Sequence, residues 1–293
     1  MPPHQLRTLL YVPGDRPDRI EKAFGAAPHG VIVDLEDSVA ASRKQEARDS
    51  MARALRARPG PGRVLAVRIN AADTGLAEDD VDALEPVLRG IDLIVVPMSS
   101  VAGVRHVAAL LGRAEARAGL PPGQVRVIPL VETAAGICDA RSIAEADDRI
   151  HTLAFGPADL ARELGVTPTA DGTELLFARS QLVLAAAAAG RHRPIDGPHL
   201  DLDDTDGLVR SAALARRLGF GGKQVIHPRQ IEAVAAAFTP SANELDWARR
   251  VDRAFGEAEA AGVSSIRLDD GTFVDQPIAR RARALLDAEK PSR

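Results

Sequence analysis

The chain of 293 residues has few aromatic side chains, almost no cysteine and little net charge. Aromatic residues make up 3% of the sequence, so leucine, valine, isoleucine and alanine must form the core. Cys138 is the single cysteine, which excludes an internal disulfide and a cysteine-rich metal site and is typical of a reducing compartment. The formal charge of −4, with both signs interspersed, offers no general field for nucleic acid, so we expect no nucleic-acid partner.

Long apolar runs are also missing. No segment approaches about 18 uninterrupted apolar residues, and the start Met1-Pro2-Pro3-His4 is not a basic stretch followed by an apolar one. We therefore expect no export signal, no contact with a membrane, and a cytoplasmic location. Hydrophobic residues at 45% and charged residues at 27% are ordinary globular usage. The length suits one large domain, or a domain with a small appendage.

The sequence does contain a regular alternation of two kinds of segment. Short apolar runs rich in β-branched residues alternate with amphipathic runs rich in alanine and arginine, which is typical of βα units around a parallel sheet. The predicted strands are residues 8–12, 31–35, 64–69, 93–97, 125–131, 152–155, 193–196 and 223–226, and the seventh is short and polar. Eight parallel strands predict a closed (β/α)8 barrel of the TIM type, which we place at residues 1–238.

Helices are predicted between the strands and beyond them. The clearest are residues 42–58, 81–88, 101–118, 173–189 and 205–218. Ser42 with Gln45, and Ser241 with Glu244, have the spacing of capping boxes, and Pro228 marks a further helix start. After the barrel we expect a helix to about residue 261, a short run at 265–275 and an amphipathic helix at 278–288. Residues 239–293 are therefore predicted to form a C-terminal helical arm.

Polar residues follow seven of the eight predicted strands, where the active site of such a barrel lies. An isolated acid after a strand often only caps the next helix, but convergence on one rim favours a site. Glu132 and Asp159 follow neighbouring strands, offer hard oxygen ligands and have no histidine or cysteine cluster beside them. This combination points to Mg²⁺, completed by water and a chelating substrate, rather than to Zn²⁺.

Three further residues at or near this rim have alternative interpretations. Arg68 could hold a substrate carboxylate through two parallel hydrogen bonds, or could form a salt bridge with Glu36 or Asp37. His227 has a side chain suited to a general base, but a capping or rim role before Pro228 is the favoured interpretation. Cys138 lies in an alanine-rich helical stretch, which predicts a small buried hydrophobic residue.

Six motifs in the chain occur in an order that resembles a known family. They are Leu10-Tyr11-Val12-Pro13-Gly14, Val33-Asp34-Leu35-Glu36-Asp37-Ser38-Val39, Val67-Arg68-Ile69-Asn70, Val131-Glu132-Thr133-Ala134, Phe155-Gly156-Pro157-Ala158-Asp159-Leu160 and Gly222-Lys223-Gln224-Val225-Ile226-His227-Pro228. Over residues 6 to 288 the sequence resembles the CoA-ester lyases of the citrate lyase beta-subunit group, with the malyl-CoA and citramalyl-CoA lyases, in the HpcH/HpaI aldolase superfamily.

The resemblance implies a role for each residue of the rim. Glu132 and Asp159 would bind Mg²⁺, Arg68 would hold a 2-oxoacid, and Glu36 and Asp37 would order the water molecules of the metal. The residues implied to contact CoA are Tyr11, Lys22, Lys44, Ile226 and His227. The chain departs from the family at two positions: Asp18 stands near a site where some relatives carry lysine, and Ala158 replaces an acid that many relatives have before the metal-binding aspartate.

The arm contains a seventh motif, Gly271-Thr272-Phe273-Val274-Asp275-Gln276-Pro277. The resemblance implies that Asp275 reaches the site of a neighbouring subunit and acts as acid or base, in a homo-oligomer that is a trimer or a multiple of one. The alternative is that Asp275 caps the last helix, before Pro277. The apolar face of that last helix also suggests that it needs another surface to pack against.

The expected activity is therefore that of a Mg²⁺-dependent carbon–carbon lyase acting on an acyl-CoA thioester and a 2-oxoacid. The same site could hydrolyse the thioester if its base activated water. Two alternatives remain: a citrate lyase beta subunit that uses an acyl-carrier thioester, and a non-catalytic barrel that binds CoA or dicarboxylates.

Overall fold

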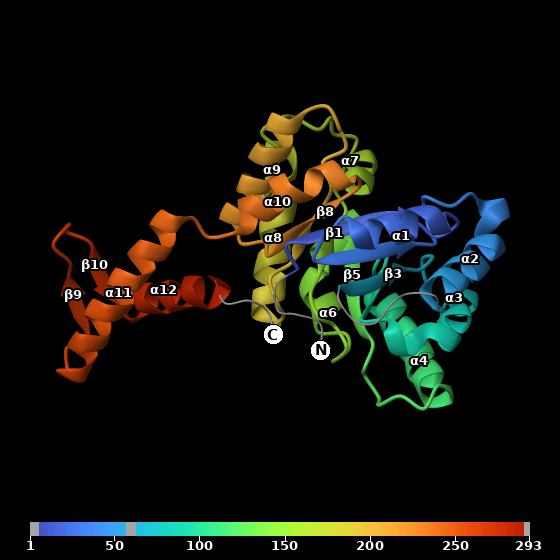
Figure 1. The fold of residues 1–293 in the computed structure, drawn as a ribbon, viewed down its shortest axis with the longest axis horizontal. Coiled ribbons are helices and arrows are strands. Elements are labelled where there is room, and N and C mark those ends of the chain that lie inside the picture. The colour runs from blue at the N-terminus through green and yellow to red at the C-terminus, as the bar shows by residue number, and fades with distance from the viewer. Residues whose placement is uncertain (1–5, 57–62, 290–293) are drawn as a thin grey trace. The chain divides into compact units, whose positions relative to one another are not determined.

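The computed structural model describes residues 6–56 and 63–289, and the end of the predicted helix 42–58 lies outside these ranges. Eight parallel strands follow one another around a closed barrel, and β1 pairs with β8 (Figure 1). The strands are β1 Thr8–Pro13, β2 Gly30–Asp34, β3 Val64–Arg68, β4 Leu93–Val96, β5 Arg126–Val131, β6 Ala154–Phe155, β7 Ile195–Asp196 and β8 Gly222–Val225. The predicted barrel is confirmed, and the polar seventh segment forms a strand of two residues.

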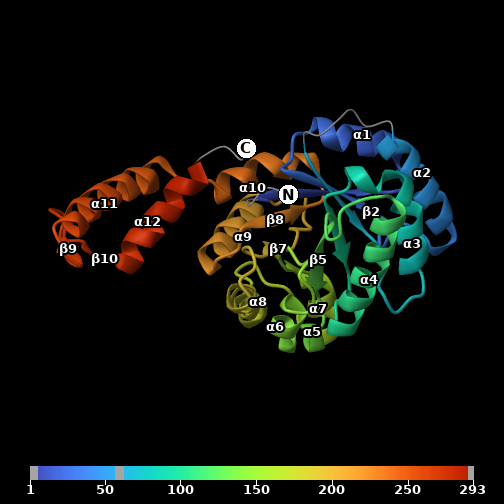
Figure 2. The ribbon, with the colours of Figure 1, turned by 90° about the horizontal axis from the view of Figure 1, so that it is seen from below.

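Helices surround the strands, as the view in Figure 2 shows. They are α1 Pro17–Gly25, α2 Lys44–Arg56, α3 Ala77–Leu84, α4 Val101–Arg117, α5 Ala134–Cys138, α6 Ala140–Ala144, α7 Pro157–Leu164, α8 Leu176–Ala188, α9 Thr205–Leu218 and α10 Ile231–Phe238. Short 3-10 turns precede α2, α8 and α10 at Ala41–Arg43, Thr173–Leu175 and Pro228–Gln230, and another, Glu85–Gly90, follows α3.

Two expectations about the helices are wrong. The capping box at Ser42 is not formed, because α2 begins at Lys44 and the Gln45 side chain bonds Arg48 and Asp49 instead. Cys138 is exposed at the end of α5 rather than buried. The apolar pattern around it belongs to Ile137, which is buried, and a helix of five residues turns the next side chain outward.

The interior of the barrel is filled by aliphatic side chains from every strand except β8. The buried cluster consists of Leu6, Leu9, Ile32, Val64, Ala66, Leu93, Val95, Ile128, Leu130, Ala154 and Ile195. Its members alternate along the strands, because successive strand residues point to opposite faces. Tyr11 of β1 is partly buried and packs against this cluster. The core is therefore aliphatic, as the scarcity of aromatic residues predicts.

The chain divides into two compact units, Met1–Ala235 and Ala236–Arg293. The second unit contains α11 Ala242–Ala260, an antiparallel hairpin of β9 Ser265–Arg267 and β10 Phe273–Asp275, and α12 Gln276–Glu289. Both bonds of the predicted capping box are present between Ser241 and Glu244. In the described part of the chain, no helix combines the length and apolar character needed to cross a membrane.

The arm has a hydrophobic core of its own. Its buried members come from both helices and from β10: Ala248, Val251, Phe255, Val274, Ala279 and Ala282. The apolar face of α12 therefore packs within the arm, and the expectation that it needs another surface is wrong. Periodicity did not predict that α11 would provide that surface, because the hairpin of β9 and β10 lies between the two helices in the chain.

Candidate active site

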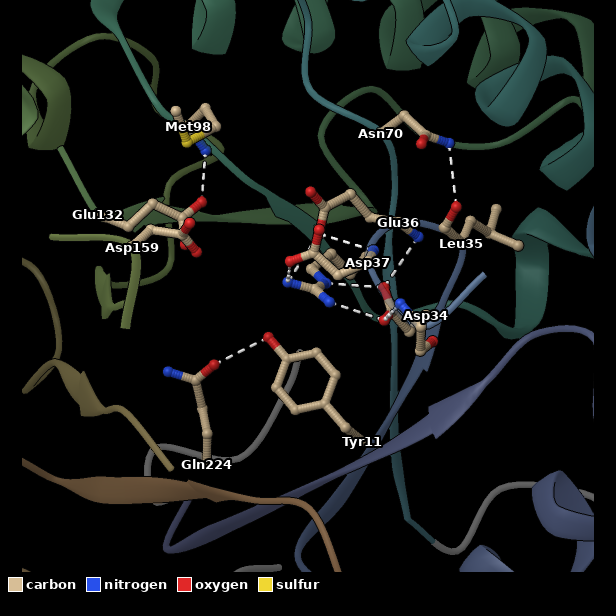
Figure 3. A network of polar contacts seen from close by, with 12 residues as sticks. Tyr11, Asp34, Leu35, Glu36, Asp37, Asn70, Met98, Glu132, Asp159 and Gln224 are labelled. Carbon is tan, nitrogen blue, oxygen red and sulfur yellow. Dashed lines mark hydrogen bonds and ion pairs between the residues drawn. The ribbon is translucent and has the colours of Figure 1, made fainter. Parts of the chain in front are cut away.

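Asp34, the last residue of β2, organises one side of the barrel rim (Figure 3). Its carboxylate is 1% exposed and accepts four hydrogen bonds. Arg68 donates from Nε and from Nη2, each over 2.7 Å, and the backbone N–H groups of Glu36 and Ser38 donate over 3.0 and 3.1 Å. Burial alone would raise the pKa of Asp34, but the Arg68 bonds and charge hold it below its usual value. Asp34 thus fixes both Arg68 and the loop that carries Glu36 and Asp37.

Arg68, the last residue of β3, is surrounded by acids. Besides Asp34, its Nη1 lies 2.8 Å from Glu36 Oε2 and 3.5 Å from Asp37 Oδ2, so the salt bridges considered as an alternative are present. Its guanidinium carbon lies 4.9 Å from the centre of the Tyr11 ring. Because Asp34 occupies the Nε–Nη2 edge, a substrate carboxylate would have to meet the Nη1–Nη2 end of the guanidinium.

Glu36 lies beside Arg68 in a partly buried position. The pKa of Glu36 is raised to about 8: burial raises it most, the charge of Arg68 lowers it, and the charge of Asp37 raises it. A carboxyl group with a pKa near neutrality can both release and accept a proton at physiological pH.

Glu132 and Asp159 lie side by side, apart from the group of Asp34, Glu36 and Asp37 (Figure 3). Glu132 directly follows β5 and is 4% exposed, and Asp159 stands in the first turn of α7. The pKa of Glu132 is raised to about 7, mainly by burial; the hydrogen bond from Met98 lowers it, and the like charge of Asp159 raises it. Asp159 has Arg162 as an ion-pair partner at 3.1 Å. A Cβ at Gly156 would collide with the Glu132 side chain, so this glycine provides the room in which the two carboxylates meet.

Met98 holds the other side of Glu132. Its backbone N–H donates to Glu132 Oε1 over 2.7 Å. Met98 has a φ of 47°, a left-handed conformation that residues other than glycine rarely adopt. Such strained residues cluster at functional sites. Nothing in the sequence indicated this role, because methionine has no preference for this conformation.

The two carboxylates fit a hard divalent cation. They form a close pair of like charges, with Glu132 buried and Asp159 half-buried, whose repulsion a cation would relieve. Both offer oxygen ligands of the kind that Mg²⁺ binds. Within residues 6–56 and 63–289, no group of three or more His, Cys, Asp or Glu side chains is placed to hold a metal. The protein would thus supply two ligands and leave the other positions to water and substrate, as Mg²⁺ usually requires.

A second polar network lies between Tyr11 and the far side of the barrel. The Tyr11 hydroxyl donates to Gln224 Oε1 over 2.8 Å, and Gln224 Nε2 donates to the Phe155 carbonyl oxygen over 2.9 Å. Burial raises the pKa of Tyr11, so it stays a neutral donor. Below it, Lys223 and Arg179 both bind the buried Asp196. The polar residues predicted to follow β7 and β8 are therefore used mainly to hold these strands together.

The predicted CoA contacts lie in different surroundings. Lys22 is exposed on α1, and Ile226 is exposed at the end of β8. Lys44 Nζ donates to the carbonyl oxygens of Leu35 and Glu36 over 2.8 and 2.7 Å, so its ammonium group fixes the loop after β2. His227 Nδ1 accepts from the Arg229 N–H over 3.2 Å, which is the predicted capping role. The role of these residues in binding CoA stays a prediction.

Asp275 belongs to the arm. Its Oδ1 accepts from the Ile278 N–H over 3.2 Å at the start of α12, so the predicted helix cap is present. A cap leaves the second carboxylate oxygen available to another partner. Its role on a neighbouring subunit stays a prediction.

Comparisons with known proteins agree with this fold. The family model described as HpcH/HpaI aldolase/citrate lyase matches residues 7–228. The citrate lyase subunit beta of Leuconostoc mesenteroides subsp. cremoris is 35% identical over 283 residues, 96% of this chain and 92% of that protein. The (3S)-malyl-CoA thioesterase of Cereibacter sphaeroides is 35% identical over 273 residues, 93% of this chain and 90% of that protein.

A solved structure resembles the whole chain. It is protein CitE from Mycobacterium tuberculosis in complex with magnesium, acetoacetate and coenzyme A, with a TM-score of 0.78 and 34% identity over 97% of this chain and 98% of that one. The barrel, its rim carboxylates and these likenesses define an enzyme of the carbon–carbon lyase class. The chain belongs to the HpcH/HpaI aldolase/citrate lyase family.

Proposed function

We propose that the chain is a Mg²⁺-dependent CoA-ester lyase, which makes or breaks the bond between a 2-oxoacid and the α-carbon of an acyl-CoA. The observation that carries this proposal is that the buried Glu132 and the half-buried Asp159 lie side by side on one rim, where the charge of Arg68 also reaches Glu132. The magnesium and coenzyme A in the structure of the Mycobacterium tuberculosis relative support it.

The reaction requires stabilisation of negative charge at two oxygens, the hydroxyl or keto oxygen and the thioester oxygen of the enolate. In the cleavage direction the substrate hydroxyl loses its proton, the carbon–carbon bond breaks, and its electron pair passes to the thioester as an enolate that is protonated at the α-carbon. Mg²⁺ bound to Glu132 and Asp159 would supply Lewis-acid stabilisation of the hydroxyl or keto oxygen. Arg68 would add positive charge at that oxygen and orient the neighbouring carboxylate.

Other residues would position groups or move protons. Asp34 keeps Arg68 in one orientation, and we assign Glu36 and Asp37 the ordering of water near the metal. The rim supplies no carboxyl group that we assign to the α-carbon. Asp275 of a neighbouring subunit would carry that proton, a contribution of about 10²–10⁴-fold for general acid–base catalysis.

A second candidate activity is hydrolysis of the thioester. It is favoured by the relative named (3S)-malyl-CoA thioesterase, which matches most of the chain. The same barrel mouth would hydrolyse a malyl-CoA-type product if Asp275 activated water instead of the α-carbon. The likeness to citrate lyase beta subunits supports a third variant of the same site, in which the thioester is carried by an acyl-carrier protein.

One experiment separates these activities. The purified protein is incubated with Mg²⁺ and with malyl-CoA, citramalyl-CoA or methylmalyl-CoA, and the products are identified by mass spectrometry. A lyase gives a 2-oxoacid and a shorter acyl-CoA, whereas a thioesterase gives the free hydroxydiacid and CoA. A Glu132→Gln variant should give neither. If every CoA ester stays intact, a carrier-bound thioester is tested next, and failure there contradicts the proposed chemistry.

A further inference from the structure

The described residues contain two buried side-chain polar atoms without a hydrogen-bond partner, Arg179 Nη1 and His199 Nε2. A buried polar atom that lacks a partner destabilises the fold by about 1–3 kcal/mol, so such atoms are rare and need an explanation. Both residues line the same cavity, outside the carboxylate mouth. This coincidence makes the cavity a candidate binding site.

The cavity has a volume of about 780 Å³ and lies beside α8 and α9, which run next to each other in Figure 1. Apolar side chains form much of its wall, among them Pro168, Leu175, Pro198 and Leu214. Arg217 of α9 also lines the cavity and is exposed. A volume of this size is within the range of small-molecule sites, which typically combine apolar walls with a few polar groups.

Arg179 is held in place, but not all of its N–H groups have a hydrogen-bond acceptor. Its Nε donates to Asp196 Oδ1 over 3.1 Å, and its guanidinium carbon lies 5.1 Å from the centre of the Phe155 ring. Nη1 points toward Gly172, where a Cβ would lie 3.4 Å away. Gly172 has a φ of 64°, which favours glycine, and it also lines the cavity. The guanidinium is therefore fixed before any ligand arrives.

His199 also has a buried nitrogen, Nε2, without a hydrogen-bond partner. The nearest acidic oxygen to its Nε2 is Asp204 Oδ2 at 3.6 Å, which is too long for a hydrogen bond. Asp204 Oδ1 already accepts from the Gly207 N–H over 2.8 Å and caps α9. An imidazole with hydrogen on Nε2 thus has a second unused donor, in a residue of the cavity wall.

The acids of the cavity already have partners. The Thr173 N–H donates to Asp171 Oδ1 over 3.4 Å, and the Thr169 N–H donates to Glu174 Oε1 over 3.2 Å. The Thr169 hydroxyl, which has a single hydrogen to donate, lies 2.7 Å from Asp171 Oδ1 and 2.5 Å from Glu174 Oε2. The groups without a partner are therefore the donors of Arg179 and His199, which need a hydrogen-bond acceptor. The acids do not call for a cation. A doubly charged phosphate would be repelled by these acids more strongly than a singly charged carboxylate, and the apolar walls favour an organic body.

We propose that this cavity binds a small carboxylate with an apolar body, whose carboxylate accepts hydrogen bonds from Arg179 Nη1 and His199 Nε2. The site is separate from the pair Glu132 and Asp159, although Pro157 and Ala158, which precede Asp159, belong to the cavity wall. The proposal does not depend on the lyase activity.

The test uses 4-fluorobenzoate as the probe and follows its ¹⁹F NMR signal during titration with the full-length protein. His199→Phe removes one donor, and Leu214→Trp fills the cavity. Arg217→Glu reverses a charge at the cavity wall, and its matched control is Arg253→Glu, an exposed arginine of the arm. Glu132→Gln serves as a control for binding at the carboxylate mouth. Thermal melting establishes that each variant folds, and no variant of Arg179 is needed, because its bond to Asp196 is structural.

The expected result is saturable binding by the wild type that is unchanged in Arg253→Glu and Glu132→Gln. Binding should weaken by about tenfold or more in His199→Phe, which removes a charge-assisted hydrogen bond. It should weaken similarly in Arg217→Glu, because a negative charge at the wall repels the carboxylate, and it should be lost in Leu214→Trp. Three outcomes overturn the proposal: no saturable binding by the wild type, equal affinity in all folded cavity variants, or loss of binding in Glu132→Gln alone.

Discussion

At the scale of single residues, the side chain that determines the geometry of the rim is Asp34, which binds no predicted ligand itself. We expect Asp34→Asn to lower kcat/KM by about 10- to 100-fold, because an amide turned toward Arg68 cannot replace two charge-assisted hydrogen bonds. Calorimetry should find Mg²⁺ affinity little changed, since Glu132 and Asp159 remain. The matched control is Asp92→Asn at the opposite end of the barrel, where Asp92 accepts from the Leu65 N–H. Equal activity of the two variants would contradict a positioning role for Asp34.

Arg68 itself allows a second prediction. Arg68→Lys keeps the charge, but one ammonium group cannot bind both oxygens of Asp34 and also reach Glu36, as the planar guanidinium does. We expect activity to fall by about 100-fold or more with every 2-oxoacid product. Steady-state kinetics with each substrate provide the measurement. A near-normal kcat/KM would mean that Arg68 only stabilises the loop after β2.

The sequence reveals residue types at the rim better than it reveals contacts. It placed Arg68, Glu132 and Asp159 at one mouth, because the carboxyl ends of parallel strands must meet. It did not assign Asp34 as the main partner of Arg68, since Asp34 stands before two acids that were equally good candidates. The strained backbone of Met98 and the exposure of Cys138 depend on how short segments turn, and periodicity does not report that.

At the scale of elements, the metal site joins the end of β5 to the start of α7. We predict that Glu132→Ala and Asp159→Ala each abolish Mg²⁺-dependent activity and leave the fold intact, because each variant removes one half of a repelling pair. Calorimetric titration with Mg²⁺, with circular dichroism as the control for folding, tests both. Wild-type metal affinity in either variant would exclude that residue as a ligand.

A further prediction concerns α4 and its link to β5. Glu115 of α4 is 1% exposed and accepts from the N–H groups of Gly123 and Val125 and from Arg149. Burial alone would raise the pKa of Glu115, but these hydrogen bonds lower it. A lowered folded-state pKa means that the ionised form stabilises the protein above the unfolded pKa, about 4.3, and that this stabilisation is lost as pH falls through the folded value.

Glu115→Gln should therefore reduce the free energy of unfolding at pH 7 by about 1–3 kcal/mol. Below the unfolded pKa the difference from wild type should shrink. Urea unfolding of both proteins between pH 7 and pH 3 measures this. A difference that stays constant over the whole range would show that the charge of Glu115 does not contribute.

At the scale of the whole molecule, the alternation of strands and helices was enough to predict the closed barrel. The arm was predicted as a segment but not as a folded unit. Its core joins α11, β10 and α12, and such contacts between distant segments leave no periodic signal in the sequence. With α12 packed against α11, the remaining reason to expect an oligomer is chemical: the described rim offers no carboxyl group assigned to the α-carbon, and Asp275 lies on the arm.

Asp275 permits a clean test, because asparagine caps a helix about as well as aspartate and the arm of Asp275→Asn should fold normally. We expect Asp275→Asn and Arg68→Ala to be nearly inactive alone, whereas Asp269→Asn, an exposed neighbour, should be fully active. If Asp275 acts on a neighbouring subunit, an equal mixture of the two inactive proteins, unfolded and refolded together, should recover about a quarter of wild-type activity, because one site in four then pairs an intact Arg68 with an intact Asp275. Sedimentation must detect oligomers in the same mixture. Hybrids without recovered activity, or a monomer that is active, would show that Asp275 does not act between subunits.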